Sequence, residues 1–313
     1  MTTNPLISVV VLGYNNFDRT TGPCLDSLKP WLDDPELEFI VLDNASPDGS
    51  SERTRQWCQQ NPRVFLHDSP ENLGYAGGMN KAAIFATGRW LLLVNNDTEF
   101  PSGSLDALKR TIYAAPHNLA MLGPITNAAG NGQRLYDPSK TKQDWLKLGE
   151  WLNSHPTGFF IPTYRCDFFC IAIRRDVWNT LNGLDTIFGR GYYEDFDFSL
   201  RLRKAGFEQA ITEDVFIYHQ GSATFSSSPE QRALIRKNKK LMKQRHPGLR
   251  FLHARICNME VIKAYQHTSP SIESRESFVV RKKIRESAAK LDRPKSLLKR
   301  IYWSWLLAKT GLI

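Results

Sequence analysis

Short runs of large aliphatic residues that end in asparagine or aspartate constrain the fold of this chain most strongly. Residues 91 to 94 read Leu-Leu-Leu-Val and are followed at once by Asn-Asn-Asp at positions 95 to 97. The run has neither a helical period nor an alternation of polar and apolar residues, so it predicts a strand that is buried on both faces. Ligands bind at the carboxyl ends of strands in open α/β sheets, and a carboxylate in that place suits a divalent cation. A simple turn is the alternative, because Asn and Asp also dominate turns.

The first hundred residues alternate between strand and helix signals. We expect strands at residues 7–12, 38–42, 63–67 and 90–94, and helices at 20–32, from the turn at 43–50 through Trp57, and at 79–87. Such alternation is typical of a mostly parallel, Rossmann-like α/β sheet that is flanked by helices. Three of the strands end in polar, Asx-rich segments, which a parallel sheet gathers at one edge.

The pattern loosens after residue 101. We expect helices at 104–115, 176–181, 194–205 and 229–246, strands at 120–123, 166–173 and 215–219, and a mobile Gly/Asn-rich loop at 127–138. These elements predict one α/β domain over residues 1–250. A basic, helical extension is expected over residues 251–313.

The composition excludes several classes of protein. No stretch approaches the roughly 18 to 20 apolar residues that span a bilayer, and the N-terminus lacks a signal-peptide pattern, so we expect a cytoplasmic protein. The five scattered cysteines fit reduced thiols better than a disulfide framework. Cys166 and Cys170 lack a second pair, which argues against a zinc site.

The net charge of +9 is concentrated near the C-terminus. Residues 281–313 hold 10 basic and 2 acidic residues, whereas residues 1–280 hold 31 and 30. A nucleic-acid enzyme would spread its basic surface around the catalytic groove, so we expect no nucleic-acid partner. The basic segment instead predicts contact with an anionic membrane surface, with the aromatic stretch 301–307 in the headgroup layer. Packing on the α/β domain, or on a second copy in a homodimer, is the alternative.

Two single residues at strand ends are suited to binding. Asp43 follows its strand as Asp97 does, and its carboxylate can accept a hydrogen bond from the N3–H of uracil or thymine. A helix cap or an Asx turn is the structural alternative. His219 ends a strand before a Gly/Ser loop and is a candidate metal or diphosphate ligand, although a lone histidine is more often structural.

An acidic cluster opens the helix expected at 194–205. Glu194, Asp195 and Asp197 lie among aromatic residues, which exclude water and raise the proton affinity of a carboxylate toward that of a general base. Helical spacing puts Glu194 and Asp197 on one face and Asp195 on another, so we expect the acids to have different roles. Interaction with the positive end of the helix is the structural alternative.

Taken in order, five segments of the chain resemble glycosyltransferase family 2, the inverting nucleotide-sugar transferases of GT-A fold. They are Ser8-Val-Val-Val-Leu-Gly-Tyr-Asn15, Val41-Leu-Asp-Asn-Ala-Ser46, Asn72-Leu-Gly-Tyr-Ala-Gly-Gly-Met-Asn80, Asn95-Asn-Asp97 and Tyr193-Glu-Asp-Phe-Asp197. The resemblance covers roughly residues 6 to 225. The glycine-rich segment and the Asn-Asn-Asp form are most similar to rhamnosyltransferase-type members, which build bacterial surface polysaccharides.

The resemblance implies a role for each matching residue. Asp195, together with Glu194, would provide the general base, and Asp97 and His219 would bind Mg²⁺ or Mn²⁺. The implied contacts to the donor nucleotide are Tyr14, Asn15, Asp43, Asn44, Asn72, Gly74, Gly77, Asn80 and Asn96. Position 95 is Asn where the family has an Asp-x-Asp pair, which leaves a single acidic metal ligand.

The implied reaction is a metal-dependent, inverting transfer of a sugar from dTDP-rhamnose or a UDP-sugar to a hydroxyl of a glycan acceptor. With the basic C-terminal segment, it suggests a lipid-linked acceptor and a peripheral enzyme at the inner face of the plasma membrane. A sugar nucleotidyltransferase and a non-catalytic protein that binds nucleotide sugars or glycans are the alternatives. The turn after the first strand has Gly13 but no Gly-x-Gly-x-x-Gly, which argues against a dinucleotide-dependent oxidoreductase.

Overall fold

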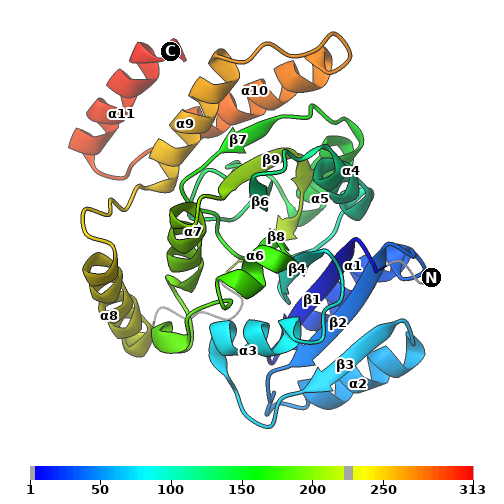
Figure 1. The fold of residues 1–313 in the computed structure, drawn as a ribbon. Helices are drawn as coiled ribbons and strands as arrows, with labels where there is room; N and C mark the ends of the chain where they lie inside the picture. Colours follow the sequence, from blue (N-terminus) through cyan, green and yellow to red (C-terminus); the bar gives the residue numbers. More distant parts are fainter. Residues whose placement is uncertain (1–3, 222–227, 313) are drawn as a thin grey trace.

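A computed structural model describes residues 4–221 and 228–312 of the chain. An eight-stranded sheet runs through the molecule in the order β3-β2-β1-β4-β8-β6-β9-β7, with helices on both of its faces (Figure 1). Its strands are β1 (Ile7–Gly13), β2 (Leu37–Asp43), β3 (Val64–Asp68), β4 (Trp90–Asn95), β6 (Leu119–Ile125), β7 (Phe160–Pro162), β8 (Cys170–Arg174) and β9 (Glu208–Phe216). Two short strands, β5 (Thr98–Glu99) and β10 (Tyr218–His219), form a separate pair.

Helices connect and follow these strands. They are α1 (Thr21–Leu28), α2 (Ser50–Gln60), α3 (Gly74–Ala83), α4 (Ser104–Ala114), α5 (Lys142–Ser154), α6 (Arg175–Thr180), α7 (Glu194–Lys204), α8 (Pro229–Arg245), α9 (Ala254–Gln266), α10 (Arg275–Leu291) and α11 (Leu297–Lys309), with 3-10 turns η1 (Lys29–Trp31) and η2 (Thr186–Phe188). The three last helices, α9 to α11, lie together at the end of the molecule that carries β7, away from β3 and α2 (Figure 1).

The parallel strands end at one edge of the sheet, as the sequence predicts. β1 pairs in parallel with β2 and with β4, so that Gly13 lies opposite Asp43 and Leu12 lies opposite Asn95. β3 continues this group on the far side of β2 and places Asp68 opposite Asp43. The Asx-rich segments that follow β1, β2 and β4 therefore meet at the carboxyl edge, where open α/β sheets bind ligands.

Two later strands run against this parallel group. β8 lies antiparallel between β4 and β6, and β7 lies antiparallel beside β9 at the edge of the sheet. β8 begins at Cys170 rather than at residue 166, and the strand expected at 215–219 is divided between the end of β9 and β10. β10 pairs with β5 and places His219 opposite Thr98, which brings this histidine to the tip of β4.

The core consists of two apolar layers, one on each face of the sheet. Val9 and Val11 of β1 belong to the layer under α1, α2 and α4, whereas Val10 and Leu12 belong to the layer under α3, α6 and α7. Successive side chains of a strand point to opposite faces, so both layers need apolar residues from the same strand. Each of residues 91 to 94 is at most 1% exposed, which confirms the strand predicted to be buried on both faces.

The glycine-rich segment forms the first turn of a helix instead of a loop before it. α3 starts at Gly74, which has a φ of +68°, and not near residue 79. A Cβ at Gly74 would lie 2.9 Å from the carbonyl oxygen of Gly189, and one at Gly78 would lie 2.7 Å from the side chain of Leu12. These glycines allow close packing against β1 and the segment before α7, and that gain outweighs their poor helix propensity.

Buried arginines join the C-terminal helices to the sheet. Arg285 of α10 is 0% exposed, and its Nε lies 3.2 Å from Oε1 of Glu213 in β9. Arg281 is 1% exposed and donates from Nη2 to the carbonyl oxygen of Leu152, at 2.6 Å. These two residues correct the expectation that the whole basic segment from residue 281 faces a membrane. Within residues 4–221 and 228–312, no helix is long and apolar enough to cross a bilayer.

We predict that Glu213→Gln lowers the free energy of unfolding by about 3–5 kcal/mol, because it leaves the buried guanidinium of Arg285 without its charge partner. Denaturant unfolding of the full chain measures this loss. Glu260→Gln is the matched control, since Glu260 pairs with Lys263 at 3.0 Å on the surface and its loss costs less than about 1 kcal/mol. Equal effects of the two substitutions would contradict the role given to the buried pair.

Candidate functional site

A cavity of about 450 Å³ opens at the carboxyl edge of the parallel strands. The first strands and the glycine-rich segment supply Leu12, Tyr14, Asn44, Asn72, Gly74, Tyr75, Asn95, Asn96 and Asp97 to its wall. Later segments supply Arg190, Tyr192, His219, Ser228, Glu230, Gln231 and Leu234. The first turns of α8 thus face the strand tips across the cavity, and its size and mixed lining suit a small polar ligand.

Side-chain amides fix the wall on the side of β2. Nδ2 of Asn44 donates to Oδ1 of Asn72 and to the carbonyl oxygen of Gly74, both at 3.2 Å. Oδ1 of Asn44 accepts from the backbone of Leu73 at 3.0 Å, and Oδ1 of Asn72 accepts from the backbone of Gly74 at 2.8 Å. The structure therefore brings Asn44, Asn72 and Gly74 to the cavity as expected, with their amides engaged in holding the glycine-rich segment.

The tips of β1 and β4 are fixed in a similar way. Nδ2 of Asn96 donates to the hydroxyls of Thr20 and Thr21 at 3.1 and 2.9 Å, which ties β4 to α1. Tyr14 lines the cavity. Asn15 is not among the lining residues, and its backbone N–H donates to Oγ of Ser46 at 2.9 Å, with a left-handed φ of 56°.

Asp43 is 2% exposed and is not among the residues that line the cavity, although the next residue, Asn44, is. Its Oδ2 accepts one hydrogen bond from the backbone N–H of Ser46 at 3.0 Å and another from Oγ of Ser51 at 2.5 Å. Oδ1 accepts from Oγ of Ser46 at 2.7 Å and retains one acceptor position. The structural role considered for Asp43 is thus present, and contact with a nucleotide base stays a prediction.

Gly77 and Asn80 are not among the cavity-lining residues. In place of the donor contact expected from the sequence, Asn80 bonds with both ends of its amide to the backbone of Leu184, at 2.8 and 2.9 Å. A Cβ at Gly77 would lie 2.9 Å from Cβ of Leu73, so this glycine serves the tight first turns of α3. Both residues therefore support the site from behind the wall.

Asp97 and His219 form a pair at the floor of the cavity. Oδ1 of Asp97 lies 3.3 Å from Nε2 of His219, while Nδ1 of the ring donates to the carbonyl oxygen of Ala128 at 2.7 Å. Burial by itself would lower the pKa of His219, but the hydrogen bond and charge of Asp97 raise it above its usual value. The amide of Asn127 bonds to both the N–H and the carbonyl oxygen of His219, at 2.9 and 2.8 Å.

The pair has the donor atoms that a divalent cation needs. Oδ1 of Asn95 is buried, lines the same cavity and has no hydrogen-bond partner among the described residues. No group of three or more His, Cys, Asp or Glu residues suited to a metal occurs in the described parts of the chain. A small set of oxygen and imidazole ligands fits Mg²⁺ or Mn²⁺, because such ions keep water and substrate phosphate oxygens as their other ligands.

The two acids that open α7 have strongly shifted proton affinities. Burial raises the pKa of Glu194 to about 8, and the charge of Asp195 adds to this shift. Burial raises the pKa of Asp195 to about 7, with a further rise from Asp167 and a partial offset from Arg165. The two neighbouring carboxyl groups therefore titrate as a pair near neutral pH.

Tyr75 connects these acids with the floor of the cavity. It lines the cavity, and its hydroxyl donates to the carbonyl oxygen of Phe168 at 2.7 Å. Burial raises the pKa of Tyr75 well above its usual value, and the charges of Glu194, Asp195 and Asp97 raise it further. The phenol therefore lies within electrostatic reach of the acids of α7 and of Asp97. Neither Glu194 nor Asp195 lines the cavity.

Asp197 has a structural role, although helical spacing puts it on the same face as Glu194. It is 0% exposed, and its carboxylate accepts hydrogen bonds from Arg201 at 2.7 Å and from Arg245 at 3.1 Å. The same carboxylate lies 2.9 Å from Nε2 of His246. These contacts hold the pKa of Asp197 below its usual value despite burial. Asp197 thus ties α8 to α7.

Two charged site residues carried no signal in the sequence. Asp167 raises the pKa of both Asp195 and His219, so its carboxylate lies within electrostatic reach of each. Arg165 donates from Nη2 to the carbonyl oxygen of Gly130 at 2.7 Å, and its side chain is 16% exposed. Both stand in an irregular segment before β8, where no periodicity indicates which side chains point inward.

A strained segment leads into the acidic cluster. Tyr192 and Tyr193 have φ values of 72° and 79°, a conformation that costs roughly 1–3 kcal/mol for a residue with a side chain. Asn238 of α8 is 0% exposed, and its Nδ2 lies 2.8, 3.0 and 3.1 Å from the carbonyl oxygens of Phe188, Gly191 and Tyr192. α8 therefore holds this segment in place, a role that its basic sequence did not indicate.

The sequence of this chain is similar to that of known proteins. The model of the family described as glycosyl transferase family 2 matches residues 8–179. An uncharacterized protein of Mycobacterium tuberculosis is 29% identical over 159 residues, and the match covers 49% of this chain and 56% of the length of that protein. The N-acetylglucosaminyl-diphospho-decaprenol L-rhamnosyltransferase of Mycobacterium tuberculosis is 23% identical over 221 residues, which cover 62% of this chain and 69% of that protein.

Solved structures share the architecture. The mannosyltransferase PcManGT from Pyrobaculum calidifontis, in complex with GDP-Man and Mn²⁺, aligns with a TM-score of 0.54 at 19% identity over 99% of this chain and 81% of that chain. A likeness at this level of identity shows the fold alone. It confirms the α/β fold of GT-A type that the order of motifs indicates.

Proposed function

Because the chain belongs to glycosyl transferase family 2, we propose that it transfers a sugar from a nucleoside-diphosphate donor to a hydroxyl of a glycan acceptor, with inversion at the anomeric carbon. One observation carries the proposal. The cavity at the strand tips has a carboxylate–histidine pair that could hold a cation, and a half-buried acid with a pKa of about 7 lies within electrostatic reach of Tyr75 in its wall. An inverting displacement needs a cation at the leaving diphosphate and a base for the attacking hydroxyl.

The base in this proposal is Asp195. At neutral pH its carboxylate has a proton affinity matched to the task, because burial raises the pKa of Asp195 to about 7. It would accept the proton of the acceptor hydroxyl as the oxygen attacks the anomeric carbon and the bond to the diphosphate breaks. Burial and the charge of Asp195 raise the pKa of Glu194, which limits the negative charge that the pair carries. Arg165 offsets part of that charge.

The residues proposed to hold a divalent cation are Asp97, His219 and Asn95. Asn95 contributes a neutral amide oxygen in place of a second carboxylate. When bound, Mg²⁺ or Mn²⁺ would offset the charge of the donor diphosphate. Without the cation, the carboxylate of Asp97 and the imidazole of His219 pair with each other at 3.3 Å.

The donor and acceptor are finer parts of the proposal. We propose dTDP-rhamnose or a UDP-sugar as donor, with the nucleoside against Tyr14 and Asn44, Asp43 close to the base, and Asn72, Gly74 and Asn96 as the surrounding wall. The likeness to a rhamnosyltransferase that acts on a lipid-linked sugar supports a lipid-linked acceptor in bacterial cell-surface polysaccharide synthesis.

We further propose that α11 places the protein on the inner face of the plasma membrane. Leu297 and Leu298 are 72% and 79% exposed, and Ile301, Tyr302 and Trp305 are 60%, 58% and 53% exposed. Lys299 and Arg300 stand exposed among them, and α11 lies at the periphery of the molecule (Figure 1). An apolar face with interfacial aromatics and basic neighbours suits an anionic headgroup layer.

We expect Asp195→Asn to lower kcat by roughly 10² to 10⁴ while donor affinity persists, because the substitution removes the base and leaves the cavity wall intact. In the wild-type protein, kcat should fall as the pH drops through about 7, since only the deprotonated carboxylate accepts a proton. Steady-state assays of donor consumption and product formation measure both effects.

Asp197→Asn is the matched control for this prediction. It removes a neighbouring carboxylate that bonds within the protein, so it should lower the melting temperature and leave kcat of the folded protein within a fewfold of the wild type. Normal turnover in Asp195→Asn, or a wild-type pH profile without a fall near 7, would reject Asp195 as the base.

For the metal site, we predict that Mn²⁺ strengthens binding of UDP or dTDP to the wild-type protein. In Asp97→Asn, the increase in affinity that Mn²⁺ produces should be at least about tenfold smaller. Isothermal titration calorimetry with and without Mn²⁺ measures it. Asp68→Asn is the control, because Asp68 also ends a strand but pairs with Arg55 at 2.9 Å outside the cavity. An unchanged Mn²⁺ effect in Asp97→Asn would refute the assignment.

For the membrane, we predict that the protein floats with phosphatidylglycerol vesicles and less with phosphatidylcholine vesicles. The double substitution of Lys299 and Arg300 by Gln should weaken binding by about 2 kcal/mol, roughly 30-fold, at about 1 kcal/mol for each charge. Ile272→Ser is the control, since Ile272 is 84% exposed outside α11. Equal flotation of the wild type with both kinds of vesicle would argue against a membrane role for the basic helix.

A further inference from the structure

The loop between β6 and α5 is closed on itself and holds the histidine of the cavity floor. The backbone N–H of Thr126 donates to the carbonyl oxygen of Gln133 at 2.9 Å, and that of Leu135 donates to the carbonyl oxygen of Thr126 at 2.7 Å. From within the loop, Asn127 and Ala128 make the three hydrogen bonds that orient His219. The mobility expected for residues 127–138 stays a prediction, although polar groups of this loop bond inward.

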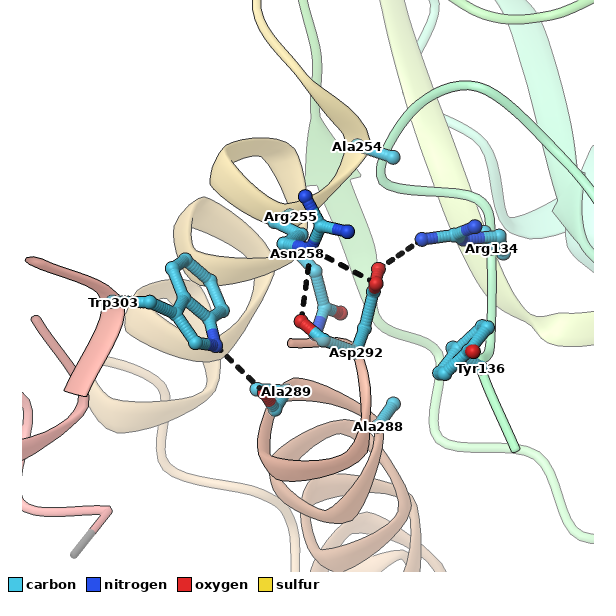
Figure 2. A pocket seen from close by; sticks show the side chains of 9 residues that line it. All are labelled: Arg134, Tyr136, Ala254, Arg255, Asn258, Ala288, Ala289, Asp292 and Trp303. Atoms are coloured by element: carbon cyan, nitrogen blue, oxygen red, sulfur yellow. Dashed lines mark hydrogen bonds and ion pairs between the residues drawn. The ribbon is translucent and has the colours of Figure 1, made fainter. Parts of the chain in front are cut away.

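The base of the same loop is held by the C-terminal helices. The guanidinium of Arg134 forms an ion pair with Asp292, the residue that follows α10. Nε of Arg255 in α9 lies 2.9 Å from Oδ1 of Asp292 and 2.9 Å from its carbonyl oxygen. Arg285 of α10 donates from Nη1 to the carbonyl oxygen of Arg134 at 3.0 Å. Figure 2 shows Asp292 between the two guanidinium groups, with Arg134 reaching it from the side of the loop.

This contact leaves little room for rearrangement. The side chains of Arg134 and Asp292 are 22% and 11% exposed, and the cavity between the surrounding residues is about 10 Å³. That volume has room for at most about one water molecule. Nε1 of Trp303 in α11 donates to the carbonyl oxygen of Ala289 at 3.1 Å and joins the last helix to this point (Figure 2).

We propose that the C-terminal helices position His219, with Asp292 as a positioning residue that acts through Arg134 and the loop 126–135. The inference rests on the proposed function for the role of His219 toward a metal, but the geometry of the ring is independent of that role. The extension is then part of the active-site framework in addition to any contact it makes with a membrane.

The test uses the full-length chain with ¹⁵N-labelled histidine. Asp292→Asn should shift the ring nitrogen resonances of His219, assigned with a His219→Gln variant, because the loop that bonds its Nδ1 loses its anchor. Arg134→Gln should produce the same shift while it leaves the contact between Asp292 and Arg255 in place, which guards against misfolding of the helices. Asp34→Asn is the matched control, since Asp34 and Lys109 form a remote ion pair of similar burial, with side chains 17% and 15% exposed.

The second readout is Mn²⁺-dependent binding of UDP or dTDP by calorimetry. We expect Asp292→Asn and Arg134→Gln to lower the affinity for the nucleotide in the presence of Mn²⁺ by about 2- to 30-fold. The affinity without metal should remain unchanged. Unaltered His219 resonances in both variants would overturn the proposal, as would equal loss of binding with and without Mn²⁺. A wild-type protein without any Mn²⁺ effect would refute the proposed metal site, and the resonances of His219 alone would then decide the positioning role.

Discussion

The parallel register of β1, β2 and β4 is the constraint on which the cavity depends. Parallel neighbours end side by side, so the chain must turn three times within a small area, and the backbone groups exposed there need partners. Asn44 and Asn72 supply such partners with their side-chain amides, and Asn96 ties the tip of β4 to two threonine hydroxyls. Hydrogen bonds therefore fix the wall, and Asn95 and Asp97 at the tip of β4 line the cavity.

Local patterns in the sequence were sufficient for the first half of the fold. The run at residues 91 to 94 is apolar on both faces because helices cover both sides of the sheet, and this burial is readable without knowledge of partners. The antiparallel insertion of β8 between β4 and β6 was not readable, since a strand of five residues shows no direction in its composition. α5, which no sequence signal indicated, and the division of β9 from β10 likewise depend on contacts distant in the chain.

The candidate site shows the same division. Asp97, His219 and the acids of α7 were predicted because each stands at a strand end or a helix start, where local geometry limits its direction. The contact of Asn80 with the backbone of Leu184 could not be predicted, because that partner lies more than a hundred residues away. Net charge also misled in part, since a count of basic residues cannot distinguish Arg285, which is buried against β9, from Lys299, which is exposed.

The ion pair of Arg285 with Glu213 has a consequence for how such proteins diversify. A domain whose tail is a separate module can exchange that tail by recombination in the linker. Here the partner of the tail lies on β9 inside the sheet, so an exchanged tail would leave a buried charge behind unless β9 changed with it. The extension and the sheet must therefore evolve together, and chimaeras between relatives should be joined before β9 rather than after α8.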